Sequence, residues 1–165
     1  MMTRILPLRI GLLALASALG SPAFAQSPDR ARVRTEVATA LEVYVGAFSQ
    51  GRADFIADSV YVAPAYFLGG SSVEVRMTSS DVRAHFERMM EPLPAQGYQR
   101  SEIRSSRVCV LSNIAAIAHL GFARVRTDGS VIVAGDAAYF YTKTPEGWRV
   151  VASIGGTGGP ADCPD

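Results

Sequence analysis

The second half of the chain alternates long β-branched and aromatic runs with short turn sequences. Ser112-Asn113, Thr127-Asp128-Gly129 and Thr144–Gly147 separate these runs, and turns of this length join antiparallel neighbours. We therefore expect four consecutive antiparallel strands at Ile103–Leu111, Ile114–Arg126, Ser130–Lys143 and Trp148–Ile154. Strands of this length twist and curl, so the helices of the first half of the chain are expected to fill the concave side of a curved sheet.

The first half begins with a long amphipathic helix. Ser27-Pro28-Asp29 combines a capping hydroxyl, a proline and an acidic residue, which is a typical helix start. Apolar residues then recur every three or four positions, which predicts one buried stripe at Val33, Val37, Leu41, Tyr44, Val45 and Phe48. Gly51 ends this helix, and a second, short helix is expected at Arg52–Ser59.

Two short strands and a third helix complete the expected elements. Val60–Leu68 contains Pro64, which suits an irregular or edge strand, and Val73–Met77 follows a glycine turn. Thr78 and Asp81 form a cap signal for the next helix. Helices gathered on one side of an antiparallel sheet make an α+β fold.

The N-terminus has the pattern of a cleavable signal peptide. Arg4 and Arg9 precede the apolar run Ile10–Leu19, and Ala23-Phe24-Ala25 is a small-x-small cleavage site. We expect residues 1–25 to be removed, leaving a domain at 26–154 and a Gly/Pro-rich tail at 155–165. The apolar run is shorter than the roughly 20 residues of a membrane span. The protein is therefore expected to be periplasmic or secreted, with no stable membrane anchor after cleavage.

Charge and cysteine content narrow the function classes. The chain has 16 Lys+Arg and 15 Asp+Glu, so removal of Arg4 and Arg9 gives a nearly neutral domain without the basic patch of a nucleic-acid-binding protein. Cys109 and Cys163 are either a disulfide, as an oxidising compartment favours, or a buried thiol and a loose tail. With only His85 and His119 in the chain, no metal site is expected.

From Asp29 to Ile154 the chain resembles the NTF2-like superfamily, the cone-shaped α+β fold of SnoaL-like cyclases, ketosteroid isomerases and scytalone dehydratases. Element order, the segment Ala47–Asp54 and the closing segment Glu146–Val151 carry the resemblance. The region from Phe67 to Phe86 is closest to a bacterial subgroup outside the named enzymes. The resemblance implies a curved antiparallel sheet wrapped around a long N-terminal helix and two shorter helices. It also implies an internal pocket and a homodimer formed through the outer face of the sheet.

Proton-transfer enzymes of the superfamily use a pocket Asp, His or Tyr, so we sought such groups within the strands. His119 is the best candidate for a general base, and Asp136 in the next strand could orient it. The competing interpretation is a histidine satisfied by a hydrogen bond and an acid at a bulge. Both faces of Ile114–Arg126 are largely apolar, so the pattern leaves open which face lines the pocket. His85 is expected at the rim, in solvent.

Aromatic residues could line the pocket. Phenols in an apolar pocket donate hydrogen bonds to a carbonyl or an enolate. A subunit contact explains strand tyrosines at least as often, and core packing explains an aromatic stripe more often than a binding site does. The candidates are Tyr44, Phe48, Phe55, Tyr66, Tyr139 and Tyr141. Four arginines could offer a cation to an acidic ligand or lie on a solvated face: Arg76, Arg104, Arg107 and Arg124.

No nucleophile elbow, phosphate loop or metal-binding motif is present in the sequence, and no cofactor is expected. Three hypotheses remain, of which the first is a domain that holds a small apolar or amphipathic molecule. The second is an isomerase, dehydratase or hydrolase that uses His119 as general base. The third is a homodimeric protein-interaction module.

Overall fold

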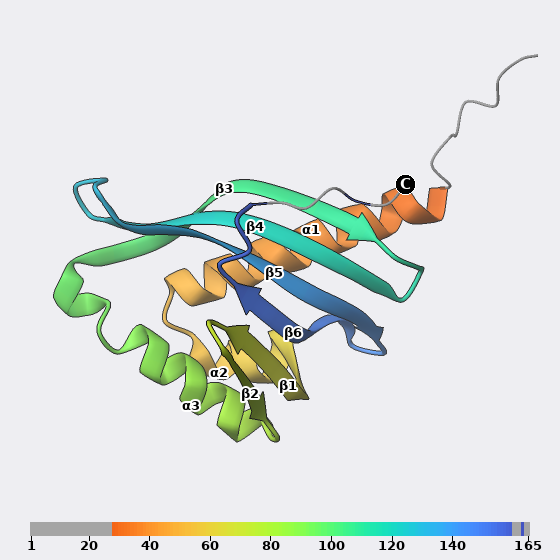
Figure 1. Cartoon of the computed structure of the whole chain (residues 1–165), viewed down its shortest axis with the longest axis horizontal. Helices are drawn as coiled ribbons and strands as arrows, with labels where there is room; N and C mark the ends of the chain where they lie inside the picture. Colours follow the sequence, from red (N-terminus) through yellow and green to blue (C-terminus); the bar gives the residue numbers. More distant parts are fainter. Residues whose placement is uncertain (1–27, 160–162, 164–165) are drawn as a thin grey trace, which may run out of the picture.

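A computed structural model describes residues 28–159 and Cys163 (Figure 1). The predicted signal peptide and part of the predicted tail lie outside these residues. The elements in chain order are α1 (Pro28–Ser49), α2 (Ala53–Phe55), the π-helical turn η1 (Ile56–Val60), β1 (Tyr61–Gly69), β2 (Ser72–Arg76), α3 (Ser79–Met90), the 3₁₀ turn η2 (Pro94–Gln96), β3 (Tyr98–Val110), β4 (Ala115–Arg126), β5 (Val131–Thr144) and β6 (Gly147–Gly155).

The six strands form one mixed sheet in the order β2-β1-β6-β5-β4-β3. The predicted meander β3–β4–β5–β6 is antiparallel throughout, and β1 pairs with β2 in the same way. β1 and β6, however, run parallel, so the curved sheet is mixed and not antiparallel at this junction. Parallel neighbours need a long crossover connection. Here the connection from β1 to β6 contains every element from β2 to β5. β1 is therefore an inner strand, with an irregular register between Tyr61 and Tyr66.

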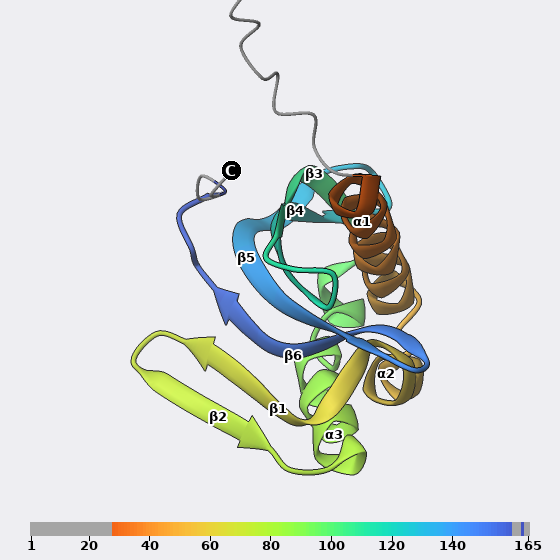
Figure 2. The same ribbon diagram turned by 90° about the vertical axis from the view of Figure 1, so that its right-hand side faces the viewer.

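The sheet curls around α1, with α3 closing one end of the resulting cone (Figure 2). The predicted apolar stripe of α1 is buried, including Val33, Val37, Leu41, Tyr44 and Phe48. On its polar side, Glu36 Oε2 accepts hydrogen bonds from Lys143 Nζ and Trp148 Nε1, each at 2.7 Å. These two bonds tie the helix to β5 and β6.

Local sequence signals fix α3. Thr78 and Asp81 form the predicted capping box, in which each side chain bonds to the other residue's backbone N–H. Val82 and Phe86, one turn apart, are the fully buried residues of the helix. The expected helix at Arg52–Ser59 is instead a single α-helical turn followed by η1. Burial of Ile56, Ala57 and Val60 holds this wider turn against the core.

A disulfide joins Cys109 in β3 to Cys163, 54 residues later. The structure thus has the bridged form of the two cysteine alternatives. Beyond β6, the Gly156 N–H donates a hydrogen bond to the Asp136 carbonyl at 2.8 Å. Residues 156–159 leave the sheet on the side of β5 away from α1 (Figure 2).

Candidate functional site

The cone contains a cavity of about 440 Å³. Its walls come from α1, β1, α3 and the concave side of β4 and β5, and the β1–β2 hairpin borders its mouth. Pairing of β6 with β5 ends at Ala137 and Gly155, and β5 residues 133–136, beyond this pair, also border the cavity. Exposed residues at the mouth include Gly69, Ser72, Glu74 and Val133.

The structure settles which face of the sheet is concave. Leu120, Phe122 and Arg124 of β4 face the core or the cavity, so the residues between them face outward. Gly135 of β5 leaves room for this arrangement, because a Cβ there would lie 3.3 Å from the Phe122 ring. The wall opposite the helices is therefore formed by alternate residues of β4 together with β5.

Three buried phenols meet inside the cone. Tyr44 from α1 contacts Tyr61 from β1 and Tyr139 from β5, with ring centroids 6.2 and 5.2 Å apart. The Tyr44 and Tyr139 hydroxyls are hydrogen-bond partners, and Tyr61 bonds to Ser153. Burial raises the pKa of all three phenols, so each stays neutral and keeps its O–H. Neutral phenols can donate hydrogen bonds to a ligand oxygen in the cavity.

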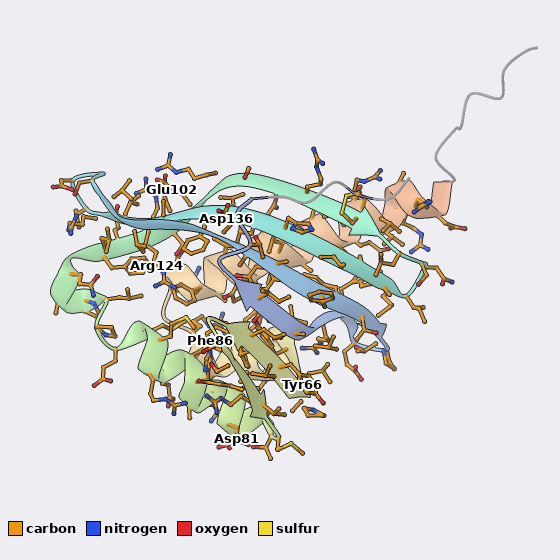
Figure 3. All side chains as sticks on the ribbon, in the orientation of Figure 1. Tyr66, Asp81, Phe86, Glu102, Arg124 and Asp136 are labelled. Atoms are coloured by element: carbon orange, nitrogen blue, oxygen red, sulfur yellow. A yellow bond between two sulfur atoms is a disulfide. The ribbon has the colours of Figure 1, made fainter. Side chains whose placement is uncertain are left out.

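The other predicted aromatic residues have different positions. Tyr141 is buried, but its hydroxyl does not line the cavity and has no hydrogen-bond partner among the described residues. Phe48 borders a smaller neighbouring cavity of about 30 Å³. Phe55 packs beneath the Arg52 guanidinium, 4.6 Å from its ring centroid. Tyr66 is 43% exposed (Figure 3), and its neighbour Phe67 takes the position inside.

His119 lies on the outer face of β4 and does not line the cavity. The prediction that it acts as a general base on a ligand in the cavity therefore needs correction. It is 8% exposed, and its Nδ1 has no hydrogen-bond partner in the described chain. The Asp136 backbone borders the cavity, but its carboxylate lies on the outer face, because its Oδ1 would be 3.4 Å from a Cβ built on Gly121. Because both faces of β4 are largely apolar, the sequence pattern did not show which of its residues face the cavity.

His85 of α3 lines the cavity, contrary to the expectation that it is solvated at the rim. Its side chain is 16% exposed, and its ring lies on Phe67 with centroids 4.0 Å apart. Nδ1 is 3.5 Å from Arg76 Nη2, while Nε2 is buried without a hydrogen-bond partner among residues 28–159. Burial, and then the charge of Arg76, lower the pKa of His85. The residue is therefore a neutral imidazole near pH 7.

A local signal in the sequence indicates that His85 faces the core. The capping box at Thr78 fixes the register of α3, and Val82 is on its buried face. His85 follows Val82 by three residues and therefore lies on a neighbouring part of the same face.

Within the described part of the chain, no cluster of three or more potential metal ligands occurs, and no helix is long and apolar enough to cross a membrane.

The fold and its cavity define a class: an α+β cone whose curved sheet and helices enclose a pocket. A family model for an NTF2-like protein (DUF6841) matches residues 35–157. The chain belongs to this NTF2-like family. A search of curated proteins gave no match.

Solved structures share the fold at low sequence identity. An NTF2-like protein with a cystatin-like fold from Novosphingobium aromaticivorans has a TM-score of 0.61 and 18% identity, covering 83% of this chain and 91% of that one. A proposed dehydratase of the NTF2-like family from Streptomyces avermitilis has a TM-score of 0.60 and 13% identity, covering 81% and 99%. An NTF2-like superfamily protein from Salmonella enterica has a TM-score of 0.58 and 18% identity, covering 81% and 94%. At these identities the likeness establishes the fold alone.

Proposed function

We propose that this NTF2-like domain binds a small apolar or amphipathic molecule inside its cone. The observation that carries the proposal is the cavity of about 440 Å³, whose aromatic walls include Tyr44, Tyr61, Phe67, Phe86 and Phe122. Pockets of several hundred Å³ with apolar walls and a few polar groups are typical ligand sites. The phenol hydroxyls would donate hydrogen bonds to a carbonyl or hydroxyl oxygen of the ligand.

We also propose that the domain works outside the cytoplasm. Two observations support this: the signal-peptide pattern at residues 1–25 and the disulfide between Cys109 and Cys163. Disulfides persist in oxidising compartments and are rare in the cytosol. Mass spectrometry of the protein isolated from periplasmic and extracellular fractions tests this, with a mature N-terminus at Gln26 as the expected result. Recovery only from the cytoplasm, with Met1 retained, would contradict it.

Titration with N-phenyl-1-naphthylamine, a neutral fluorophore that brightens in apolar surroundings, tests ligand binding. We expect saturable binding to the wild type. Ala137 is buried and lines the cavity, so Ala137→Phe fills it and should weaken binding at least about tenfold by steric exclusion. Ala95 is exposed in η2, so Ala95→Phe adds the same ring outside and should not change binding. Equal binding by both variants, or none by the wild type, would contradict the proposal.

Proton transfer is a second candidate function, favoured by the unpartnered Nε2 of His85 in a cavity that also contains neutral phenols. Nε2 would take a proton from the carbon next to a ligand carbonyl, and a phenol O–H would stabilise the enolate oxygen. Return of a solvent deuteron to that carbon completes the exchange. NMR of 2-tetralone in D₂O tests this. The wild type and His119→Asn should accelerate exchange, and His85→Asn should not. If the wild type does not accelerate exchange, or if His85→Asn retains the acceleration, this candidate is excluded.

A further inference from the structure

We infer that Arg124 binds the carboxylate of an amphipathic ligand whose apolar part occupies the cavity. The inference rests on the proposed function and specifies its ligand as an organic monocarboxylate. Arg124 projects from the concave face of β4 toward the side of the cone where Phe86 lies (Figure 3).

Arg124 is a half-buried cation without an anion. Its guanidinium lies over Phe48, 4.7 Å from the ring centroid, and 5.7 Å from that of Phe122. Its protein acceptor is Met89 Sδ, 3.6 Å from Nη2, which is a weak acceptor, and its Nε is buried without a partner. Within the described chain, no carboxylate lies within ion-pairing distance of this side chain.

Three other arginines of the sheet have the carboxylate partner that Arg124 lacks. Arg76 forms an ion pair with Glu74, and both Arg100 and Arg104 pair with Glu102. Those arginines are on exposed surfaces or at the mouth, where water also solvates them. A guanidinium that is partly removed from water loses solvation, and an anionic partner restores most of what is lost. Of these four arginines, Arg124 is the one that lacks a carboxylate partner, so it has the most to gain from an anion.

The neighbouring donors suit a carboxylate. Tyr44, Tyr139 and Arg124 line both the main cavity and the smaller one of about 30 Å³ beside it. The guanidinium offers several N–H donors. The Tyr44–Tyr139 pair offers one further O–H, because one of the two hydroxyls donates to the other. A carboxylate can accept from several such donors at once. A neutral amide or alcohol would satisfy fewer of these donors.

Charge also sets the orientation of the ligand. Glu74 lies at the mouth, and its carboxylate is near His85 Nδ1 at 3.8 Å. An anionic group placed at the mouth would meet the Glu74–Arg76 ion pair, whereas one placed inside would meet Arg124, which has no carboxylate partner. The apolar part of the ligand would then extend past Phe67 and Phe86 toward the opening.

Calorimetric titration with 2-naphthylacetate and 2-naphthylacetamide tests this inference. The two probes share the ring system and differ at the head group. We expect the wild type to bind the acid at least about tenfold more tightly, as the net contribution of a hydrogen bond to a charged group predicts. Arg124→Met should lose this preference and bind the amide within about twofold of wild type, and Arg124→Lys should keep part of it. Arg104→Gln removes the same charge from an exposed position and should change neither affinity.

The outcomes separate the inference from the proposed function. Equal wild-type affinity for the two probes overturns the role of Arg124 and leaves ligand binding intact. Retention of the acid preference by Arg124→Met also overturns that role. Binding of neither probe, together with no binding of the neutral fluorophore, overturns the proposed function and the inference with it. The wild-type comparison needs no variant, so it decides the matter even where Arg124→Met does not fold.

Discussion

At the residue scale, the two histidines of the chain occupy opposite faces of the fold. Both are largely buried, and each has a ring nitrogen without a hydrogen-bond partner in the described chain. His85 lines the cavity, whereas His119 lies on the outer face of the sheet. The position of a histidine along a strand therefore says little about function until the phase of that strand is known.

The lowered pKa of His85 makes stability depend on pH. Because burial and Arg76 hold the folded-state pKa below the ordinary 6.5, the unfolded chain binds a proton that the folded chain does not. Stability should be greatest above pH 6.5, fall as the pH drops through the lowered pKa, and level off below it. Glu74, which favours the charged form, and Arg88, which opposes it, also act on this group.

NMR titration of the His85 ring protons measures this pKa, and urea unfolding at pH 7.5 and 5.5 measures the linkage. The difference in stability between the two pH values should shrink in His85→Gln. A His85 pKa at or above 6.5 would show that the imidazole is solvated.

At the element scale, α1 is fixed to the sheet by Glu36. Its carboxylate bonds to Lys143 and Trp148 of β5 and β6 and to Arg32 one turn earlier. Hydrogen bonds from Lys143, then Trp148 and Arg32, lower the pKa of Glu36 to about 2. The stability from these contacts should be present above pH 4.5 and be lost as the pH falls toward 2.

A carboxyl-detected NMR titration should therefore show Glu36 ionised to about pH 2. Glu36→Gln should lower Tm and weaken the acid dependence of unfolding between pH 4.5 and 2. Glu42 is on an exposed part of the same helix, so Glu42→Gln is the matched control and should change little. An ordinary pKa for Glu36, near 4.5, would mean that the contacts to β5 and β6 do not persist in solution.

Most elements could be predicted because local patterns specify them. The stripe of α1, the capping box of α3 and the turns between β3 and β6 are local, and the structure contains all of them. β3 begins at Tyr98 and not at the expected Ile103. The prediction missed the first part of the strand because residues 99–102 are polar and show no apolar alternation. The parallel pairing of β1 with β6 depends on residues about 90 positions apart, which no local pattern encodes.

The site was harder to predict than the fold. Tyr44 and Tyr139 were identified because buried phenols on a helix stripe and a strand face stand out. Arg124 was one of four equivalent arginines in the sequence, and only the concave phase of β4 distinguishes it. His85 and Phe67 were missed because their roles depend on how α3 packs against β1.

At the scale of the whole molecule, the disulfide between β3 and the tail constrains the chain. A closed loop of 54 residues removes entropy from the unfolded state, while the bridge also restrains the tail in the folded state. Cys109→Ser together with Cys163→Ser should therefore lower unfolding stability by a net ~2 kcal/mol. Urea unfolding of the wild type with and without reductant should give the same difference. No change in either comparison would show that the bridge is absent or constrains nothing.

We propose, as the superfamily resemblance implied, that two copies pair through the outer face of the sheet. Sedimentation velocity at several concentrations should show twice the chain mass. Ser105 is exposed in β3 and pairs with the outward-facing Gly121 of β4, so Ser105→Arg should weaken the dimer, whereas Ala95→Arg on η2 should not. A strict monomer at every concentration would contradict this pairing.

The central claim is that the cone holds a small molecule, and native mass spectrometry of the protein purified from its own host tests it most directly. We expect a complex heavier than the chain by one small organic molecule, which denaturation releases and which the Ala137→Phe variant lacks. A carboxylic acid in the released fraction would agree with the role of Arg124. Recovery of the native protein at the mass of the polypeptide alone, in repeated preparations, would contradict the claim.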